Sequence, residues 1–195
     1  MDLPSSHARS ELILGGQKSG KSGRAETLAR DWLAASAQRD AVLIATGQAH
    51  DEEMAERIAR HRRERALRVP GMATVEEPLR LASCIDGLAS PTTLLVVDCL
   101  TLWVVNWLMP AVARDEAGPV AAFEAQADAL IAALGRCAGP AVLVSNEIGL
   151  GVIPMGRDVR AYVDTLGTLN QRLARACERV TLMTAGLPLC LKGQA

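Results

Sequence analysis

The feature that most constrains the fold is an eight-residue loop, GGQKSGKS, at residues 15–22. It follows the apolar run Leu12–Leu14 and precedes a helix-length segment at about residues 21–36. The loop matches G-x-x-x-x-G-K-[ST] in full, and a strand before it with a helix after it is the context that this motif requires. A glycine-rich turn with a chance Lys-Ser pair is the alternative, which the flanking segments disfavour. The loop therefore predicts a site for a nucleoside triphosphate.

The chemistry of this phosphate loop assigns roles to its residues. Glycines allow successive backbone N–H groups to point at a phosphate, and the helix N-terminus adds positive potential. We expect Lys21 to bridge the β- and γ-phosphates and the Ser22 hydroxyl to bind Mg²⁺. The predicted nucleotide-binding residues of the loop are Gly15, Gly16, Gln17, Lys18, Ser19, Gly20, Lys21 and Ser22.

Apolar runs alternate with helix-length segments along the rest of the chain. The runs are Leu12–Leu14, Ala41–Ala45, Thr93–Asp98, Ala141–Ser145 and Val180–Thr184, and the candidate helices cover about 21–36, 51–65, 77–89, 119–138 and 159–177. This alternation predicts an α/β fold with a mostly parallel sheet flanked by helices. The C-terminal AGLPLCLK adds a candidate edge strand, because Pro188 disfavours a central position.

The domain prediction follows from this pattern and from the length of 195 residues. We expect a single P-loop NTPase domain over residues 11–195 and a flexible N-terminal tail over residues 1–10. Residues 109–119 are expected to form a surface excursion within that domain.

Composition limits the classes of partner and compartment. The formal net charge of -1 gives no global field that favours nucleic acid. No apolar run reaches the ~20 residues that span a bilayer, and no signal peptide is recognised. The five cysteines are scattered without a C-x-x-C pair. We therefore expect a soluble, cytoplasmic and reduced protein without nucleic-acid partners.

Asp98 and His61 are two further candidate site residues, and the sequence pattern alone does not decide between a functional and a structural role for either. Asp98 ends the run TTLLVVD, where it suits either a carboxylate that holds Mg²⁺ through water or a cap of the following helix. His61 lies on the helix DEEMAERIARHRRERA, on one face with Met54, Ile58 and Arg65. Spacing alone favours a packed histidine or a solvated basic helix end, whereas the surrounding arginines suit a triphosphate.

Three other stretches are less specific. Asn146 and Glu147 follow a strand, which suits a ligand-binding edge as well as a structural turn. Asn170 lies beside an apolar helical stripe that is expected to belong to the core. Trp103 and Trp107 are interpreted first as packing or a subunit contact, and only second as a surface for a flat ligand.

Six stretches in this order give the chain a specific resemblance. They are LILGGQKSGKSGRAE, LIATGQAHDEEMAERIARHRRER, TVEEP, LLVVDCLTLWVVN, VSNEIGLGVIP and GTLNQRLARACERVTLMTAGLPLCLK. Together they resemble the bifunctional adenosylcobinamide kinase/adenosylcobinamide-phosphate guanylyltransferase family over roughly residues 11–192. The resemblance implies a RecA-like core, and it also implies a homotrimer.

The resemblance implies two reactions. One phosphorylates adenosylcobinamide with ATP or GTP, and the other transfers GMP from GTP to adenosylcobinamide-phosphate through a GMP–histidine intermediate. His61 matches the histidine that carries GMP. The other matching nucleotide-binding positions are Ala45, Thr46, Gly47, Arg62, Arg63, Glu64, Arg65, Glu76 and Asp98. Mg²⁺ is the implied cofactor, with Ser22 and Asp98 as its ligands.

The chain departs from the family pattern between His61 and Glu76. Members commonly carry proline just after the position of Arg65 and tryptophan before the T-x-E-E-P stretch, whereas this chain has Ala66 and Met72. Two alternative functions remain from the residues alone. One is a P-loop small-molecule kinase without nucleotidyl transfer, and the other is a GTP-binding module without catalysis.

Overall fold

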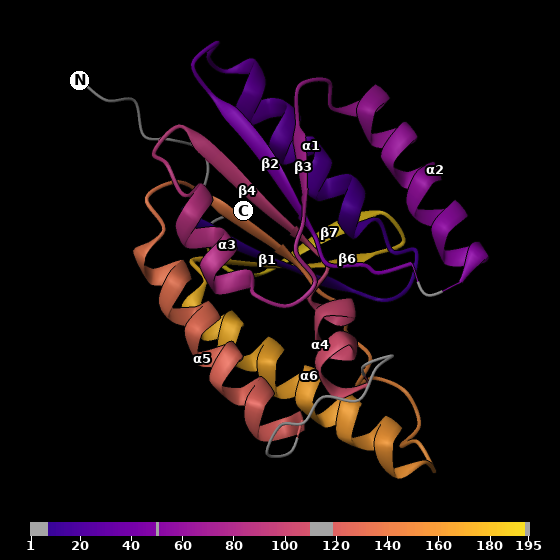
Figure 1. The fold of residues 1–195 in the computed structure, drawn as a ribbon. Coiled ribbons are helices and arrows are strands. Elements are labelled where there is room, and N and C mark those ends of the chain that lie inside the picture. The colour runs from indigo at the N-terminus through magenta and orange to yellow at the C-terminus, as the bar shows by residue number, and fades with distance from the viewer. Residues whose placement is uncertain (1–7, 50, 110–118, 194–195) are drawn as a thin grey trace.

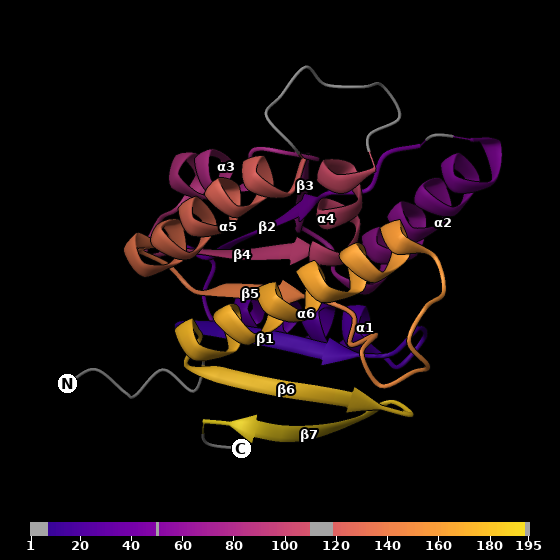
Figure 2. The same cartoon turned by 90° about the horizontal axis from the view of Figure 1, so that it is seen from below.

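A seven-stranded sheet forms the centre of the molecule, in the order β3-β2-β4-β5-β1-β6-β7. The computed structural model describes residues 8–49, 51–109 and 119–193. Within them the strands are β1 (Ser10–Gly15), β2 (Asp40–Ala45), β3 (Ala73–Glu76), β4 (Thr93–Asp98), β5 (Ala141–Val144), β6 (Arg179–Thr184) and β7 (Leu187–Lys192). The first six run parallel, and β7 pairs with β6 in the antiparallel sense, as Figure 2 shows.

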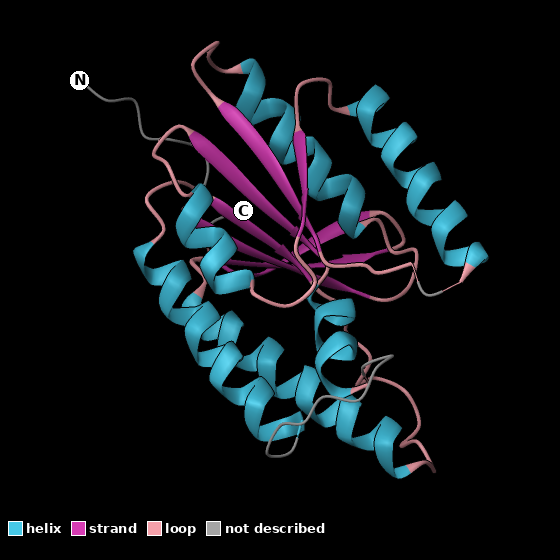
Figure 3. Ribbon diagram, viewed as in Figure 1, coloured by secondary structure: helices cyan, strands magenta, loops and turns pink. Residues whose placement is uncertain are grey.

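Helices cover both faces of this sheet (Figures 1 and 3). They are α1 (Lys21–Ala34), α2 (Glu52–Arg68), α3 (Leu81–Leu88), α4 (Leu100–Leu108), α5 (Pro119–Arg136) and α6 (Arg157–Ala176). Helix α1 packs on one face of the sheet, and α2 lies on the same side at the periphery. Helices α3 to α6 cover the other face. The predicted class, an α/β fold with a mostly parallel sheet flanked by helices, is confirmed.

The alternation of side chains along the central strands explains why both faces need helices. Leu12 of β1 contributes to the core under α3 to α6, while its neighbour Ile13 contributes to the core under α1. In β4, Leu95 and Val96 divide between the same two cores. Strands that are buried on both faces appear in the sequence as continuous apolar runs, because every side chain is covered.

Several boundaries differ from the prediction. Strand β3 was not among the predicted strands, because its residues are mostly exposed and it lies at the sheet edge. Strand β1 begins at Ser10, one residue before the boundary expected between tail and domain. Residues 1–7 of the predicted tail and residues 110–118 of the predicted surface excursion lie outside the described residues. The predicted C-terminal edge strand is confirmed as β7.

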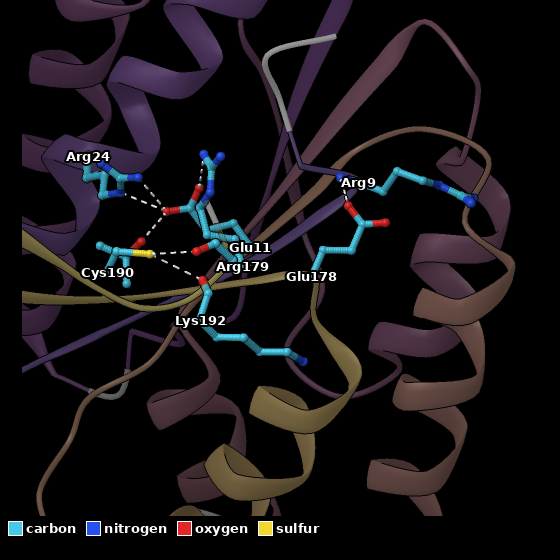
Figure 4. A network of polar contacts seen from close by, with 9 residues as sticks. Arg9, Glu11, Arg24, Glu178, Arg179, Cys190 and Lys192 are labelled. Atoms are coloured by element: carbon cyan, nitrogen blue, oxygen red, sulfur yellow. Dashed lines mark hydrogen bonds and ion pairs between the residues drawn. The ribbon is translucent and has the colours of Figure 1, made fainter. Parts of the chain in front are cut away.

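A buried carboxylate ties β1 to its neighbours. Glu11 is only 3% exposed, accepts a hydrogen bond from Arg24 Nε at 2.8 Å and accepts one from Thr181 Oγ1 at 2.8 Å. Its second oxygen lies 3.7 Å from Arg179 Nη1. Figure 4 shows these side chains converging on Glu11 from β1, α1 and β6. Arg24 belongs to the first turns of α1, so this cluster also orients the helix that begins at the phosphate loop.

Replacing Glu11 with leucine is expected to destabilise the fold by about 3 kcal/mol, because Arg24 and Arg179 would then remain partly buried without their carboxylate. Urea denaturation measures the change in the free energy of unfolding. The control is Asp31→Ala, which breaks the exposed Arg30–Asp31 pair and should cost less than about 1 kcal/mol. Equal losses in the two variants would contradict a structural role for the Glu11 cluster.

Candidate functional site

The phosphate loop turns sharply between β1 and α1, and two of its glycines allow that turn. A Cβ atom on Gly15 would lie 2.5 Å from the Met183 carbonyl oxygen, which no side chain tolerates. Gly20 has a φ of 101° and is the N-cap of α1. Glycine is the residue that adopts this conformation without strain, so both positions are needed for the backbone path.

The loop presents the features of an anion site. No side chain caps the N-terminus of α1, and its first turn carries no acidic residue. The first N–H groups of a helix lack partners within the helix and attract anions through the helix dipole. Lys18 adopts a left-handed conformation with a φ of 56°, which turns the loop back on itself. Such loop backbones cradle phosphates, so the predicted site has the expected shape.

Lys21 is the cation of the site. It is 9% exposed, and its Nζ donates a hydrogen bond of 2.6 Å to the Gly16 carbonyl oxygen across the loop. Burial lowers the pKa of Lys21, and electrostatic interactions with Cys99 and Asp98 oppose that shift. A partly desolvated cation whose bonded partner is a neutral carbonyl favours an anionic ligand.

Asp98 ends β4 beside this lysine. Its negative charge acts on the pKa of both Lys21 and Arg65, which places these three residues around one site. In the part of the chain that the structure describes, no hydrogen bond or ion pair occupies the Asp98 carboxylate. The carboxylate is therefore available for a metal or a ligand. The alternative of a helix cap is not observed, because α4 begins after Cys99 without a side-chain cap.

Mg²⁺ can be tested against the donors that are present. A hydroxyl from Ser22 and a carboxylate from Asp98 are hard oxygen ligands, which Mg²⁺ prefers. The described residues contain no group of three or more His, Cys, Asp or Glu side chains that could hold a metal. Mg²⁺ commonly binds through one or two protein oxygens together with substrate phosphates, so these donors fit a metal that arrives with a nucleotide.

The segment from Ala45 to Gly47 leaves β2 at the same edge of the sheet. Thr46 is fully buried, and its hydroxyl accepts a hydrogen bond of 3.0 Å from Cys99 N and donates one of 2.6 Å to Cys99 O. Side chains of Ile58 and Leu102 close on Gly47. The position after β2 is thus held directly beside Asp98, as the predicted nucleotide site requires.

His61, unlike Lys21, Asp98 and Thr46, lies away from the phosphate loop. It is exposed on α2, and among the described residues no hydrogen bond or ion pair connects it to the phosphate loop. No residue of α2 is buried. The predicted face is only partly confirmed, because Met54, Ile58 and Arg65 are half-buried while His61 faces solvent.

The charged neighbours of His61 bind other parts of the chain. Arg62 pairs with Glu76 of β3. Arg65 Nε lies 3.7 Å from Glu26 of α1, and burial lowers the pKa of Arg65 while Asp98 and Glu26 oppose the shift. Glu64 pairs with Arg68, and Arg63 is exposed. The structure therefore brings Arg65 to the Asp98 site and leaves Arg62, Arg63, Glu64 and Glu76 away from the loop in polar contacts of their own or in solvent.

The loop after β5 borders the phosphate loop. Glu147 N donates a hydrogen bond of 3.1 Å to the Gly15 carbonyl oxygen, and the Glu147 carboxylate accepts one of 2.9 Å from Gly149 N. The Asn170 side chain donates to the Asn146 carbonyl oxygen at 3.0 Å. Beyond these contacts the side chains of Leu150, Val152, Ile153 and Met155 are between 77% and 95% exposed.

The two tryptophans and Asn106 of α4 hold loops rather than a flat ligand. Trp103 is fully buried and donates a hydrogen bond of 2.8 Å to Leu79 O, so its interpretation as packing is confirmed. Asn106 was not predicted as a site residue, although it is an amide within the apolar stretch LTLWVVNWL.

Cys99 is not a nucleophile candidate, because burial, more than the neighbouring Asp98, raises its pKa to about 11.

A parallel sheet, a glycine-rich loop leading into a helix, and a strand-end carboxylate beside the loop lysine define a P-loop nucleotide-binding protein. Residues 11–191 match the family model described as cobinamide kinase / cobinamide phosphate guanyltransferase, and the chain belongs to this family.

Two relatives support this family assignment. The chain is 46% identical over 185 residues to the bifunctional adenosylcobalamin biosynthesis protein CobP of Pseudomonas aeruginosa, covering 94% of this chain and 98% of that one. It is 36% identical over 187 residues to the bifunctional adenosylcobalamin biosynthesis protein CobU of Escherichia coli, covering 93% and 98%. The family resemblance inferred from the six sequence stretches is confirmed.

Two solved structures with low sequence identity to this chain support its fold, and they support nothing beyond the fold. The flagellar accessory protein FlaH of Methanocaldococcus jannaschii aligns with a TM-score of 0.54 and 12% identity, covering 96% of this chain and 80% of that one. A protein of Pyrococcus horikoshii aligns with a TM-score of 0.53 and 11% identity, covering 97% and 89%. Among the described residues, no helix has the length and apolar character needed to cross a membrane.

Proposed function

We propose that this chain phosphorylates adenosylcobinamide with ATP or GTP and then transfers GMP from GTP to adenosylcobinamide-phosphate, giving adenosylcobinamide-GDP. The family match over residues 11–191, which spans both the phosphate loop and the histidine helix, carries the proposal. Incubating the protein with adenosylcobinamide, GTP and Mg²⁺ and identifying the corrinoid products by mass spectrometry tests it. The expected final product is the GDP derivative, and recovery of only the monophosphate would leave a simple kinase.

The phosphate loop binds the triphosphate in both reactions. Backbone N–H groups of residues 15–22 and the N-terminus of α1 bind the phosphate oxygens. Lys21 exchanges its bond with Gly16 for the β- and γ-phosphates. Ser22 and Asp98 would hold Mg²⁺, which would neutralise charge that develops on the phosphates.

His61 carries GMP in the second reaction. A neutral imidazole nitrogen attacks the α-phosphorus of GTP, a P–N bond forms, and the bond to the bridging oxygen breaks to release pyrophosphate. The imidazole proton passes to solvent, to which His61 is open. A phosphate oxygen of adenosylcobinamide-phosphate then attacks the same phosphorus and breaks the P–N bond, and the departing imidazole takes a proton back from solvent. Arg65, which faces Asp98 and Glu26, supplies positive charge near the phosphates.

The exposure of His61 supports a movement of helix α2 during the second reaction. Helix α2 buries no side chain, and its contacts with α1 are ionic, through Glu26 with Arg65 and Arg68. Such contacts exchange with water at little cost, so α2 is free to swing toward the phosphate loop. The same loop then serves phosphoryl transfer with α2 open and guanylyl transfer with α2 closed.

The acceptor is expected to lie on the loop of residues 148–155. A large exposed apolar surface marks a binding site, and this one adjoins the phosphate loop through the Glu147–Gly15 hydrogen bond. Its four exposed apolar side chains suit the broad apolar body of a corrinoid. Trp103 and Trp107 are poor candidates for this contact, because they are buried or half-buried and bond to Leu79.

Replacing Val152, which is 95% exposed, with aspartate is expected to raise the KM for adenosylcobinamide about tenfold, because a charge would meet the apolar acceptor. Formation of the GMP adduct without acceptor should be unchanged. Steady-state kinetics with varied adenosylcobinamide measure the first quantity, and intact mass measures the second. Leu67→Asp, an exposed change on α2, is the control, and an unaltered KM in Val152→Asp would contradict this placement.

Two narrower functions compete with this proposal, namely a P-loop kinase without nucleotidyl transfer and a GTP-binding module without catalysis. No contact among the described residues favours either of them. Assembly into a homotrimer is expected from the family resemblance, and sedimentation equilibrium tests it.

A further inference from the structure

One buried amide on α4 joins two loops at the carboxyl edge of the sheet. Asn106 is 4% exposed, on a helix whose other residues except Thr101 are apolar. Its Nδ2 donates hydrogen bonds of 2.8 Å to Thr46 O and 3.0 Å to Pro78 O. A buried amide is costly unless its hydrogen bonds are made, so this residue type needs these two partners. Both hydrogens of one NH₂ group are therefore used to connect different loops.

The two acceptors are the ends of the segment that carries His61. Thr46 follows β2 directly, and Pro78 lies two residues beyond β3. Between them the chain leaves the sheet, forms α2 and returns (Figure 1). Asn106 thus closes the base of this excursion, residues 47–77, from a helix on the other face of the sheet.

Neighbouring contacts reinforce the base of the excursion. Trp103 and Trp107 donate to Leu79 O at 2.8 and 3.3 Å, and Glu77 N donates to Ala45 O at 3.0 Å. By contrast, α2 buries none of its residues. The direction in which α2 projects, and so the place that His61 reaches, depends on the geometry of the two anchored ends.

We propose that Asn106 is a positioning residue that fixes both ends of the His61-bearing segment and thereby sets the approach of His61 to the α-phosphate. This inference rests on the proposed guanylyl transfer to His61. Asn106 acts through Thr46 and Pro78, and it takes no proton and forms no bond to the nucleotide. Its loss should slow the transfer step more than it weakens nucleotide binding.

The test compares Asn106→Leu with wild type in a single turnover. Leucine has the same number and branching of side-chain heavy atoms and removes both donors. We expect the rate of GMP adduct formation to fall about 10- to 100-fold, because an error of about 1 Å at a reacting atom costs about that much. The Kd for a non-hydrolysable GTP analogue should change less than about threefold. Time-resolved intact mass and equilibrium titration measure the two quantities.

Trp32→Phe is the matched control. Trp32 is also buried, and its Nε1 donates a hydrogen bond of 3.0 Å to Asp40 O at the opposite end of β2. This variant should lower the melting temperature, as Asn106→Leu does, without slowing adduct formation. Equal slowing in both variants, or a loss of analogue affinity parallel to the loss of rate in Asn106→Leu, would overturn the proposal.

Hydrogen exchange on the wild-type protein gives a test that does not depend on a folded variant. The amides of Thr46 and Glu77 at the base should exchange much more slowly than those of α2. Exchange of the base at the rate of α2 would refute the anchoring. If wild type forms no adduct, the proposed function fails, and the exchange pattern still decides whether the two ends of the segment are anchored.

Discussion

Lys21→Ala is expected to reduce both phosphorylation of adenosylcobinamide and GMP transfer at least about 100-fold, because one cation of the phosphate loop serves both reactions. Lys21 is buried, burial lowers its pKa, and its bonded partner is the Gly16 carbonyl. A bound triphosphate supplies the missing negative charge, so the charged lysine gains more from the nucleotide than an exposed one would. Parallel assays of the two activities with GTP measure the effect.

The control for Lys21→Ala is Arg30→Ala on the same helix. Arg30 is exposed and pairs with Asp31, away from the N-terminus of α1. It should retain both activities within about twofold, as surface substitutions have small effects. A Lys21→Ala enzyme that lost only one of the two activities would show that the loop serves a single reaction.

His61→Asn is expected to separate the two reactions. GMP transfer should fall by about 10⁴-fold or more, since an amide cannot replace the nucleophile. Phosphorylation should stay within a few-fold of wild type, because His61 is exposed on α2 and makes no bond to the phosphate loop. The measurement is the ratio of adenosylcobinamide-phosphate to adenosylcobinamide-GDP at fixed times.

Glu56→Gln on the exposed face of the same helix is the control for His61→Asn, and it should preserve that ratio. Loss of phosphorylation together with transfer in His61→Asn would indicate that α2 takes part in both steps. Retention of transfer would remove His61 from the mechanism.

Local signals made the phosphate loop predictable. The loop, the strand before it and the helix after it are contiguous, so residues 11–34 contain the whole geometry. The strand runs of β1, β2, β4 and β5 were equally clear, because strands buried on both faces are apolar throughout. Asp98 was correctly placed at a strand end, since the register of β4 beside β5 and β2 carries it to the edge of the sheet.

Contacts between distant segments were not predictable in the same way. Strand β3 is short and exposed, so it lacks a periodic apolar signal. The face of α2 was assigned from spacing, but its buried partner is the charged Glu26 of α1 rather than an apolar surface. Asn106 bonds to residues 28 and 60 positions away, and only its position as an amide in an apolar helix hinted at a role.

The most direct test of the central claim is intact-mass spectrometry after mixing the protein with GTP and Mg²⁺ in the absence of a corrinoid, beside His61→Asn. The account predicts a mass gain of one GMP less a water in wild type and none in the variant. No gain in wild type, under conditions where GTP binding is demonstrated, would contradict the histidine mechanism and leave a P-loop kinase or a binding module.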